Sequence, residues 1–329
     1  MTVRLATVDL GTNTVRLLVV EASGRAWRPL HQVQRVTRLG EGQASAGRLL
    51  PEPMRRTALT VAEYSRVARE LGAARVRVVA TSAVREATNR AEFVEQVEAL
   101  AGERVEVVSG EDEARLTLAG VAAALPGGVD SFVLFDIGGG SSELVRLKRS
   151  HKTQGGPPLP QIAGWMSLPH GVVTLAERHG GFTVSREIYE AMVNEVAEMI
   201  APFAREHGGV HGIHMLGTSG TVTTIAGVHL NLKRYDRSRV DGCWMSTQEI
   251  SAVIERLLGM GYEDRVASPC IGAERADLVL AGCAILEAIR HAFPCPRLRV
   301  ADRGLREGIL VQMMREDGVW GSGSQVAAS

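Results

Sequence analysis

The chain has 329 residues, more than one ordinary small domain needs and enough for two, each with a buried core of its own. Hydrophobic residues make up 45% and charged residues 22%, ordinary values for a soluble globular protein. The net charge of +0 argues against a protein that coats nucleic acid or an anionic membrane, although a few local arginines can still bind a small anion.

The N-terminus, MTVRLATVDLG, runs straight into a predicted strand and lacks the apolar core of a signal peptide. Nowhere do about 18 apolar residues follow one another, the length that a membrane-spanning helix needs. The cytoplasm is therefore the expected compartment. No two cysteines have C-x-x-C spacing, so buried free thiols are expected rather than a metal site or disulfides. The cysteines are Cys243, Cys270, Cys283 and Cys295.

Two similar segments open the two halves of the chain. The first reads VDLGTNT at 8–14 and is followed by an apolar run at 17–20. The second reads FDIGGGS at 135–141 and is followed by SELV at 142–145. Each is an apolar strand that ends in Asp, then a turn of Gly and small polar residues, then another strand. This self-similarity predicts an internal duplication.

The elements predicted in each half also come in one order, βββαβαβα, with insertions in the second half. In the first half the further strands are predicted at 30–38, 75–80 and 104–108, and the helices at 51–71, 89–100 and 111–125. Asn89 and Glu92 fit a helix N-cap with an acid three residues on. In the second half the strands are predicted at 131–136, 142–147, 161–168, 211–216 and 297–300, and the helices at 170–179, 185–206, from 221, 247–259, 272–292 and 305–314.

These patterns predict an N-terminal lobe at 1–124 and a C-terminal lobe at 125–316. The last helix, 305–316, can pack back on the N-terminal lobe. A long turn is predicted at 148–160 and a flexible tail at 317–329.

The two turns suit phosphate, because backbone amides without neighbouring Cβ atoms can converge on an anion. Asp9 and Asp136 end the preceding strands, where a carboxylate can hold Mg²⁺ directly or through water. For one turn alone, a plain β-hairpin is an equal alternative. Two copies with Asp in register favour a binding site. The turn residues are Gly11, Thr12, Asn13 and Thr14 in the first copy and Gly138, Gly139, Gly140 and Ser141 in the second.

The segment SGEDEAR, at 109–115, begins the last predicted helix of the first half. One reading is structural: Ser109 caps the helix and the acids complement its dipole. The functional reading is that one acid orients an attacking water. Phosphoryl transfer needs little covalent help, so positioning and charge neutralisation contribute most of the catalysis.

This segment resembles the S-G-x-x-E-A-R motif of the Ppx/GppA family of exopolyphosphatases and guanosine pentaphosphate phosphatases. Other stretches resemble the family in the family's own order over nearly the whole chain. They are VDLGTNTVRLLV (8–19), RLGEG (38–42), ATSAVREATN (80–89), DIGGGSSEL (136–144), SLPHG (167–171), GTSGT (217–221), ERAD (274–277) and GLREGIL (304–310).

The duplicated βββαβαβα unit likewise resembles the actin, sugar-kinase and chaperone ATPase superfamily. The resemblance implies a duplicated actin-like (RNase H-like, ASKHA) α/β fold with two lobes that face each other across a phosphate-binding cleft.

The family resemblance also implies roles for individual residues. Glu113 matches the catalytic base. Asp136 and Glu143 match the acids associated with the metal and the reacting phosphate, and Asp9 is a further metal candidate. Arg85 matches the phosphate-binding Arg of the T-S-A-x-R motif. Arg16 is a further candidate, because its place after the first turn suits a phosphate contact. Together with the residues of the two turns, the predicted phosphate-binding set is Gly11, Thr12, Asn13, Arg16, Arg85, Gly138, Gly139, Gly140, Ser141 and Arg275.

Several of these residues have structural alternatives. A surface salt bridge to Glu86 or Glu92 is the alternative for Arg85. Arg16 could be a plain strand-exit arginine, and Arg275 could lie on a helix surface rather than hold distant phosphates. The segment 217–221 could touch substrate or cap a helix. A loop histidine is more often structural or solvated than catalytic, so His170 is assigned no role.

The chain departs from the family pattern in two ways. Ser142 stands where the family usually has Thr, which keeps the hydroxyl. The chain also has no His-Asp dipeptide of an HD domain and so resembles the short, two-domain members.

The predicted reaction is hydrolysis of the terminal phosphoanhydride of inorganic polyphosphate with Mg²⁺ or Mn²⁺; K⁺ is a candidate additional ion, and the sequence leaves open whether it is required. Guanosine pentaphosphate is the alternative substrate. A small-molecule kinase that uses ATP and a non-catalytic actin-like regulator are alternatives of other classes. No nucleic acid or membrane partner is expected, and a homodimer is consistent with the family.

Overall fold

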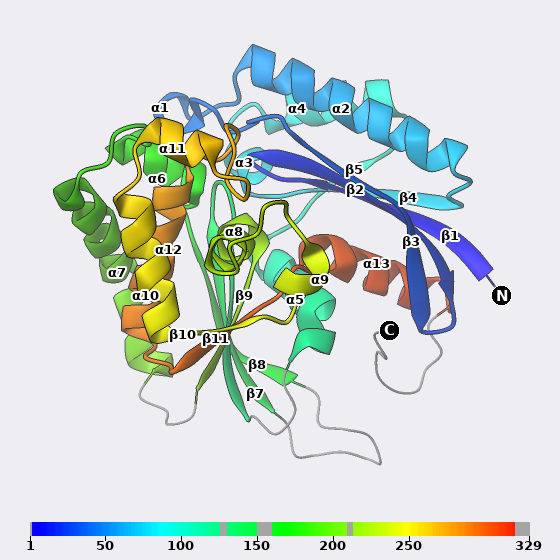
Figure 1. The fold of residues 1–329 in the computed structure, drawn as a ribbon. Helices are drawn as coiled ribbons and strands as arrows, with labels where there is room; N and C mark the ends of the chain where they lie inside the picture. The colour runs from blue at the N-terminus through cyan, green and yellow to red at the C-terminus, as the bar shows by residue number, and fades with distance from the viewer. Residues whose placement is uncertain (1, 126–129, 150–159, 209–212, 320–329) are drawn as a thin grey trace. The chain divides into compact units, whose positions relative to one another are not determined.

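The computed structural model describes residues 2–125, 130–149, 160–208 and 213–319, which divide into two units (Figure 1). Of the described residues, the first unit contains 2–123 and 304–319. The second unit contains those from 124 to 303.

The first unit has a five-stranded sheet in the order β3-β2-β1-β4-β5. β1 is antiparallel to β2, and β2 to β3, whereas β1, β4 and β5 run parallel. Parallel strands end at the same edge of a sheet, so the segments that follow β1, β4 and β5 begin at one edge. The strands are β1 (Thr2–Leu10), β2 (Thr14–Ser23), β3 (Ala26–Val36), β4 (Arg75–Ala80) and β5 (Val105–Val107). The helices are α1 (Gln43–Ala46), α2 (Pro51–Glu70), α3 (Ser82–Glu86), α4 (Arg90–Ala101), α5 (Gly110–Val121), the 3₁₀ turn η1 (Ala122–Ala124) and α13 (Leu305–Glu316).

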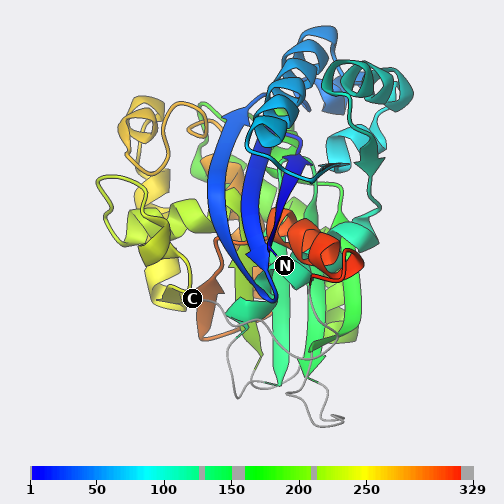
Figure 2. The same cartoon turned by 90° about the vertical axis from the view of Figure 1, so that its right-hand side faces the viewer.

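Alternation along β1 and β2 sends apolar side chains to both faces of this sheet. On one face Val8 and Leu17 pack with residues of α2 and α4. On the other face Leu5 and Leu18 pack with α13 and with Leu116 of α5, and Figure 2 shows α13 (red) beside these strands (blue). Both faces are covered, which explains the continuous apolar run at 17–20 of β2 and the burial of residues 5–10 of β1 on both faces.

Helices α5 and α13 touch backbone to backbone. A Cβ atom on Gly308 would lie 1.8 Å from the carbonyl oxygen of Leu116, and one on Gly120 would lie 1.9 Å from that of Gly304. Only glycine permits such an approach. The C-terminal helix therefore fixes the position of α5, which carries Glu113.

We expect Gly308→Ala to lower the stability of the protein by about 1–3 kcal/mol, the usual cost of forcing extra volume into a packed contact. Thermal unfolding measures this loss. Gly259→Ala is the control, because Gly259 has a φ of −74° and a Cβ there would lie 3.6 Å from its nearest neighbours. Equal melting temperatures for the two variants would contradict the expectation.

The second unit has a six-stranded sheet in the order β10-β11-β9-β6-β7-β8. Its strands β8-β7-β6-β9-β11 repeat the order and directions of the first sheet, and β10 adds an antiparallel edge. The predicted duplication and α/β fold class are therefore confirmed. The strands are β6 (Ser131–Ile137), β7 (Ser142–Arg149), β8 (Pro160–Leu168), β9 (His214–Thr218), β10 (Trp244–Ser246) and β11 (Arg297–Val300). The helices are α6 (Val172–His179), α7 (Arg186–His207), α8 (Ser219–His229), α9 (Arg237–Val240), α10 (Thr247–Leu258), α11 (Tyr262–Ala267) and α12 (Val279–Ala292).

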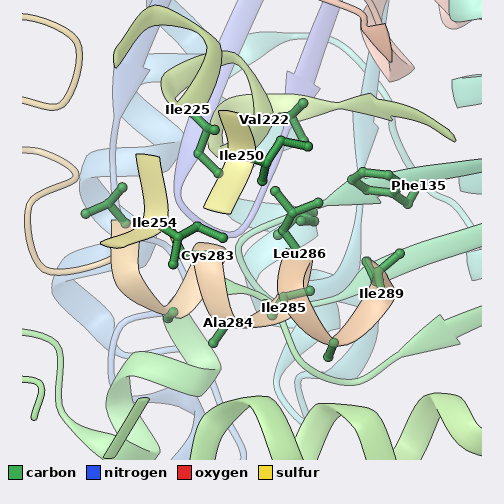
Figure 3. Packing of buried hydrophobic residues seen from close by; sticks show 14 of the residues in the cluster. Phe135, Val222, Ile225, Ile250, Ile254, Cys283, Ala284, Ile285, Leu286 and Ile289 are labelled. Atoms are coloured by element: carbon green, nitrogen blue, oxygen red, sulfur yellow. The ribbon is translucent and has the colours of Figure 1, made fainter. Parts of the chain in front are cut away.

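The core of the second unit surrounds α12. Leu286 of this helix lies among Val222 of α8, Ile250 of α10 and Phe135 of β6 (Figure 3). Cys283 is fully buried in the same core, and burial raises the pKa of its thiol to about 12. All four cysteines are free, but only Cys270 and Cys283 are buried, and the other two are partly exposed.

Three local predictions need correction. Asn89 stands at the N-cap of α4, but its side chain does not cap the helix; it bonds the backbone N and O of Leu49, at 2.9 and 3.1 Å. The helix expected at 272–292 begins only at Val279. The third strand begins at Ala26, before the predicted 30–38. A long-range contact replaces the expected cap, turns replace the first residues of the expected helix, and pairing with β2 extends the strand toward its N-terminus.

Parts of three predictions lie outside the described residues: 211–212 of the strand at 211–216, 150–159 of the long turn, and 320–329 of the tail. Within the described chain, no helix combines the length and apolar character needed to cross a membrane.

Candidate active site

The two predicted phosphate turns have the same geometry. Gly11 N–H donates to the carbonyl of Thr14 at 3.1 Å, and Gly138 N–H donates to that of Ser141 at 3.0 Å. In each unit the Asp near the end of the first strand lies opposite a charged residue of the second strand. Asp9 is opposite Arg16, and Asp136 is opposite Glu143. The register inferred from the repeat is confirmed in both units.

The first turn is held by the segment after β3. The carbonyl of Asn13 accepts hydrogen bonds from the amides of Thr37 and Arg38, at 2.9 and 3.0 Å, and the carbonyl of Thr12 accepts one from Gly40 at 2.9 Å. A Cβ atom on Gly40 would lie 2.3 Å from the Thr12 methyl group. The stretch RLGEG (38–42) therefore supports the turn 11–14. The sequence did not reveal this role, because the two segments are separated along the chain by β2 and β3.

The Asn13 side chain has an unused polar atom. Its Oδ1 is buried and has no hydrogen-bond partner among the described residues. A buried polar atom without a partner is costly, and a bound ligand would relieve that cost. A half-turn of the amide would present its NH₂ group, which can donate to a phosphate oxygen. This observation fits the predicted anion site.

Asp9 and Arg16 form an ion pair. Arg16 Nη1 lies 3.0 Å from Asp9 Oδ2, and the Asp9 side chain is almost completely buried. Asp9 therefore positions Arg16 at the edge of the first turn. A role for Asp9 as a metal ligand stays a prediction; Arg16 contacts its Oδ2.

Arg85 and Glu113 come together at the same edge of the first sheet. Arg85 lies in α3, which follows β4, and Glu113 lies in the first turn of α5, which follows β5. Arg85 Nη1 donates to Glu113 Oε2 at 2.9 Å and to the carbonyl of Val108 at 3.0 Å. Ser109 caps α5 by accepting from the amide of Asp112 at 3.1 Å. The structural and the functional reading of the segment 109–115 are thus compatible, because Ser109 caps the helix while Glu113 is buried.

Glu113 does not project into solvent, since the residue is only 9% exposed. Arg85 also bonds Glu86, at 3.1 Å, as the alternative reading expected. A buried carboxylate held by a guanidinium has a fixed orientation, which is what a group that positions a water molecule needs.

The second turn is held by the start of α6. The carbonyls of Gly138 and Gly139 accept from the amides of Val172 and Val173, at 3.0 and 2.8 Å. A Cβ atom on Gly171 would lie 2.3 Å from the carbonyl carbon of Gly139. The conformation of Gly171 is open to any residue, so the requirement for glycine here is one of space.

Glu143 is buried beside the second turn. Its Oε1 accepts from the hydroxyls of Ser141 and Ser167, at 2.7 and 2.9 Å. Ser142 donates to the carbonyl of His170 at 2.8 Å, so the hydroxyl that replaces the usual Thr is used within the protein.

Asp136 and Glu143 fit a magnesium ion shared with a phosphate. Mg²⁺ usually takes only one or two carboxylates, with water and substrate phosphate as its other ligands. Such an ion does not need a site made entirely of protein ligands. In the described chain, no group of three or more His, Cys, Asp or Glu is placed to hold a metal. The hydroxyls that fix Glu143 would orient a ligating carboxylate.

Arg275 lies beside the start of α8. It precedes α12 rather than lying on that helix, and its Nη1 donates to Thr224 Oγ1 at 3.1 Å. Its guanidinium also lies against Gly220. Ser219, in the GTSGT stretch, has a φ of 79°, an uncommon conformation for a residue with a side chain.

The fold and these turns define a two-unit α/β protein with a similar glycine-containing turn in each unit. The model of the Ppx/GppA phosphatase family matches residues 18–317, so the chain belongs to this family. Exopolyphosphatase 2 of Mycobacterium tuberculosis is 30% identical over 325 residues, which cover 94% of this chain and 98% of that protein.

Solved structures agree with this assignment. An exopolyphosphatase-like protein has a TM-score of 0.84 and 29% identity, covering 96% of this chain and 98% of its own. The Ppx/GppA family member of Aquifex aeolicus has a TM-score of 0.78 and 27% identity, covering 98% of this chain and 100% of its own. Membership of a phosphatase family makes this protein a hydrolase, as expected from the motifs.

Proposed function

We propose that this protein is an exopolyphosphatase that releases orthophosphate from the end of inorganic polyphosphate. The observation that carries the proposal is the position of Glu113: buried, joined to Arg85 at 2.9 Å, and at the sheet edge that also bears the turn 11–14. Support comes also from the relative named exopolyphosphatase 2, which aligns over nearly the whole chain.

In the proposed reaction a water molecule attacks the terminal phosphorus. Glu113 orients this water and accepts its proton, while the bond from phosphorus to the bridging oxygen breaks. Orthophosphate is released, and the bridging oxygen leaves on the shortened polyphosphate. Glu113 then returns the proton to solvent or to a product oxygen. Because positioning contributes most of the catalysis, Glu113 need not be a strong base, and the ion pair with Arg85 fixes its orientation.

The remaining residues bind charge. The amides of the two turns, with Arg16, would contact phosphate oxygens, and Arg275 would contact phosphates farther along the polymer. Arg85 would hold Glu113 and share its guanidinium with the terminal phosphate. Asp136 and Glu143 would hold Mg²⁺ or Mn²⁺, and the ion would neutralise charge on the phosphate. The proposal assigns both units to one reaction, so variants in each should lose activity.

Phosphate release, measured side by side on polyphosphate and guanosine pentaphosphate, tests the proposal. We expect release from polyphosphate with Mg²⁺, little after chelation, and no need for an acceptor. Faster release from guanosine pentaphosphate would make that nucleotide the substrate of the same site. ADP formation that requires a small-molecule acceptor would indicate a kinase. Binding of polyphosphate without any release would indicate a regulatory protein.

A further inference from the structure

A cluster of polar side chains joins the segment 170–179 to α7; His170 is buried, His179 and Glu195 are partly exposed, and Arg178 is exposed. It consists of His170, Arg178, His179 and Glu195, and we call it the Glu195 cluster. Glu195 Oε1 accepts from His170 Nε2 at 2.6 Å and from Arg178 Nη2 at 2.9 Å, and Oε2 accepts from His179 Nε2 at 2.5 Å. The proposed reaction uses none of these four side chains.

The carboxylate at the centre of this cluster is kept charged. Burial by itself would raise the pKa of Glu195, but hydrogen bonds from His170 and His179 and the charge of Arg178 outweigh burial and lower the pKa. Hydrogen bonds to an ionised acceptor are about twice as strong as neutral ones. The cluster is therefore a firm anchor between α7, which carries Glu195, and the segment 170–179.

Only one of the two histidines is joined to the phosphate turn. The backbone carbonyl of His170 accepts from Ser142 Oγ at 2.8 Å. The next three residues, 171–173, pack on or bond to Gly138 and Gly139. His179 ends α6, two turns away, although it donates to the same carboxylate.

The bonds from Val172 and Val173 decide where the amides of the turn point. A peptide group is planar and trans, so its C=O and N–H point in opposite directions. The carbonyls of Gly138 and Gly139 point to the start of α6. The N–H groups of Gly139 and Gly140 must therefore point away from it, and these are amides that the proposed function assigns to phosphate.

We propose that His170, anchored by Glu195, is a positioning residue that holds residues 170–173 against the second turn and so fixes the direction of its phosphate-binding amides. The expected loss of activity rests on the proposed function. The positioning of residues 170–173 by His170 rests on the contacts above alone. Glu195 acts through His170 and is a positioning residue as well.

The experiment compares His170→Ala with His179→Ala in the full chain. Each variant removes one imidazole bond to Glu195, so both should lower the melting temperature. Only His170→Ala should release the turn, and we expect it to slow phosphate release from polyphosphate roughly 10- to 100-fold, with KM raised, because small misplacements of binding groups are costly in rate. His170→Gln, whose amide can donate to Glu195 from about the position of Nε2, should recover most of the activity.

Hydrogen exchange provides a readout that does not depend on activity. The amides of Val172 and Val173 should exchange faster in His170→Ala than in His179→Ala, because their bonds to the turn open more often. Equal exchange and equal activity in the two variants would overturn the inference. Failure of the unmodified protein to release phosphate would instead overturn the proposed function, and the exchange comparison would still decide the positioning role.

Discussion

Replacement of Glu113 by Gln is expected to slow phosphate release from polyphosphate by roughly 10²–10⁴-fold, the usual contribution of a general base. Gln has nearly the same shape and can still accept a hydrogen bond from Arg85, whose Nη1 lies 2.9 Å from the Glu113 carboxylate. It cannot take a proton from water. The loss should therefore appear in kcat, while KM changes little, and steady-state phosphate release measures both.

Glu111→Gln is the matched control, because Glu111 lies in the same helical turn but pairs with Arg115 at the surface. Such an exposed pair contributes little to stability. We expect its rate to match that of the unmodified protein, and both variants to keep their fold as judged by circular dichroism and melting temperature. A Glu113→Gln variant with an unchanged rate would remove Glu113 from the mechanism.

Gly171→Ala is expected to lower phosphate release by roughly 10²-fold or more, through displacement of the turn 138–141. The added Cβ would lie 2.3 Å from the carbonyl carbon of Gly139 and 2.5 Å from the carbonyl oxygen of Gly138. Both are backbone atoms, so the turn itself must move. Because the backbone of Gly171 is in an ordinary extended conformation, the substitution adds no torsional strain of its own.

The effect of Gly171→Ala should appear mainly as a raised KM for polyphosphate, since the displaced amides bind substrate. Gly259→Ala, in the same unit and with ordinary contact distances around its Cβ position, should leave both constants unchanged. If Gly171→Ala keeps full activity with a normal KM, the second turn does not bind the phosphate that reacts.

Much of the fold could be predicted from local patterns. The strand at Arg75–Ala80 has the bounds that its alternation predicts, and α2 begins at Pro51 as its proline indicates. The repeat around Asp9 and Asp136 predicts the duplicated topology, and the strand pairing places each Asp opposite the residue that the repeat aligned with it. Such features depend on neighbours in the chain, which the sequence displays directly.

The partners of the site residues could not be predicted in the same way. Arg85 was expected at phosphate or on a surface acid, whereas it also bonds Glu113, 28 residues away. Asn89 matches a helix cap, yet its side chain bonds Leu49, 40 residues away. His170 gave no signal beyond its place in a loop, and its partner Glu195 lies on α7, 25 residues away.

The sequence by itself therefore determined the family, the duplication and the turns at the strand ends, because periodicity and motif spacing record short-range constraints. Only the tertiary structure decided that Gly308 brings α13 onto α5, that Arg85 holds Glu113, and that Gly171 and His170 support the second turn. These contacts join segments that chain folding brings together, and which side chains meet there depends on packing in three dimensions.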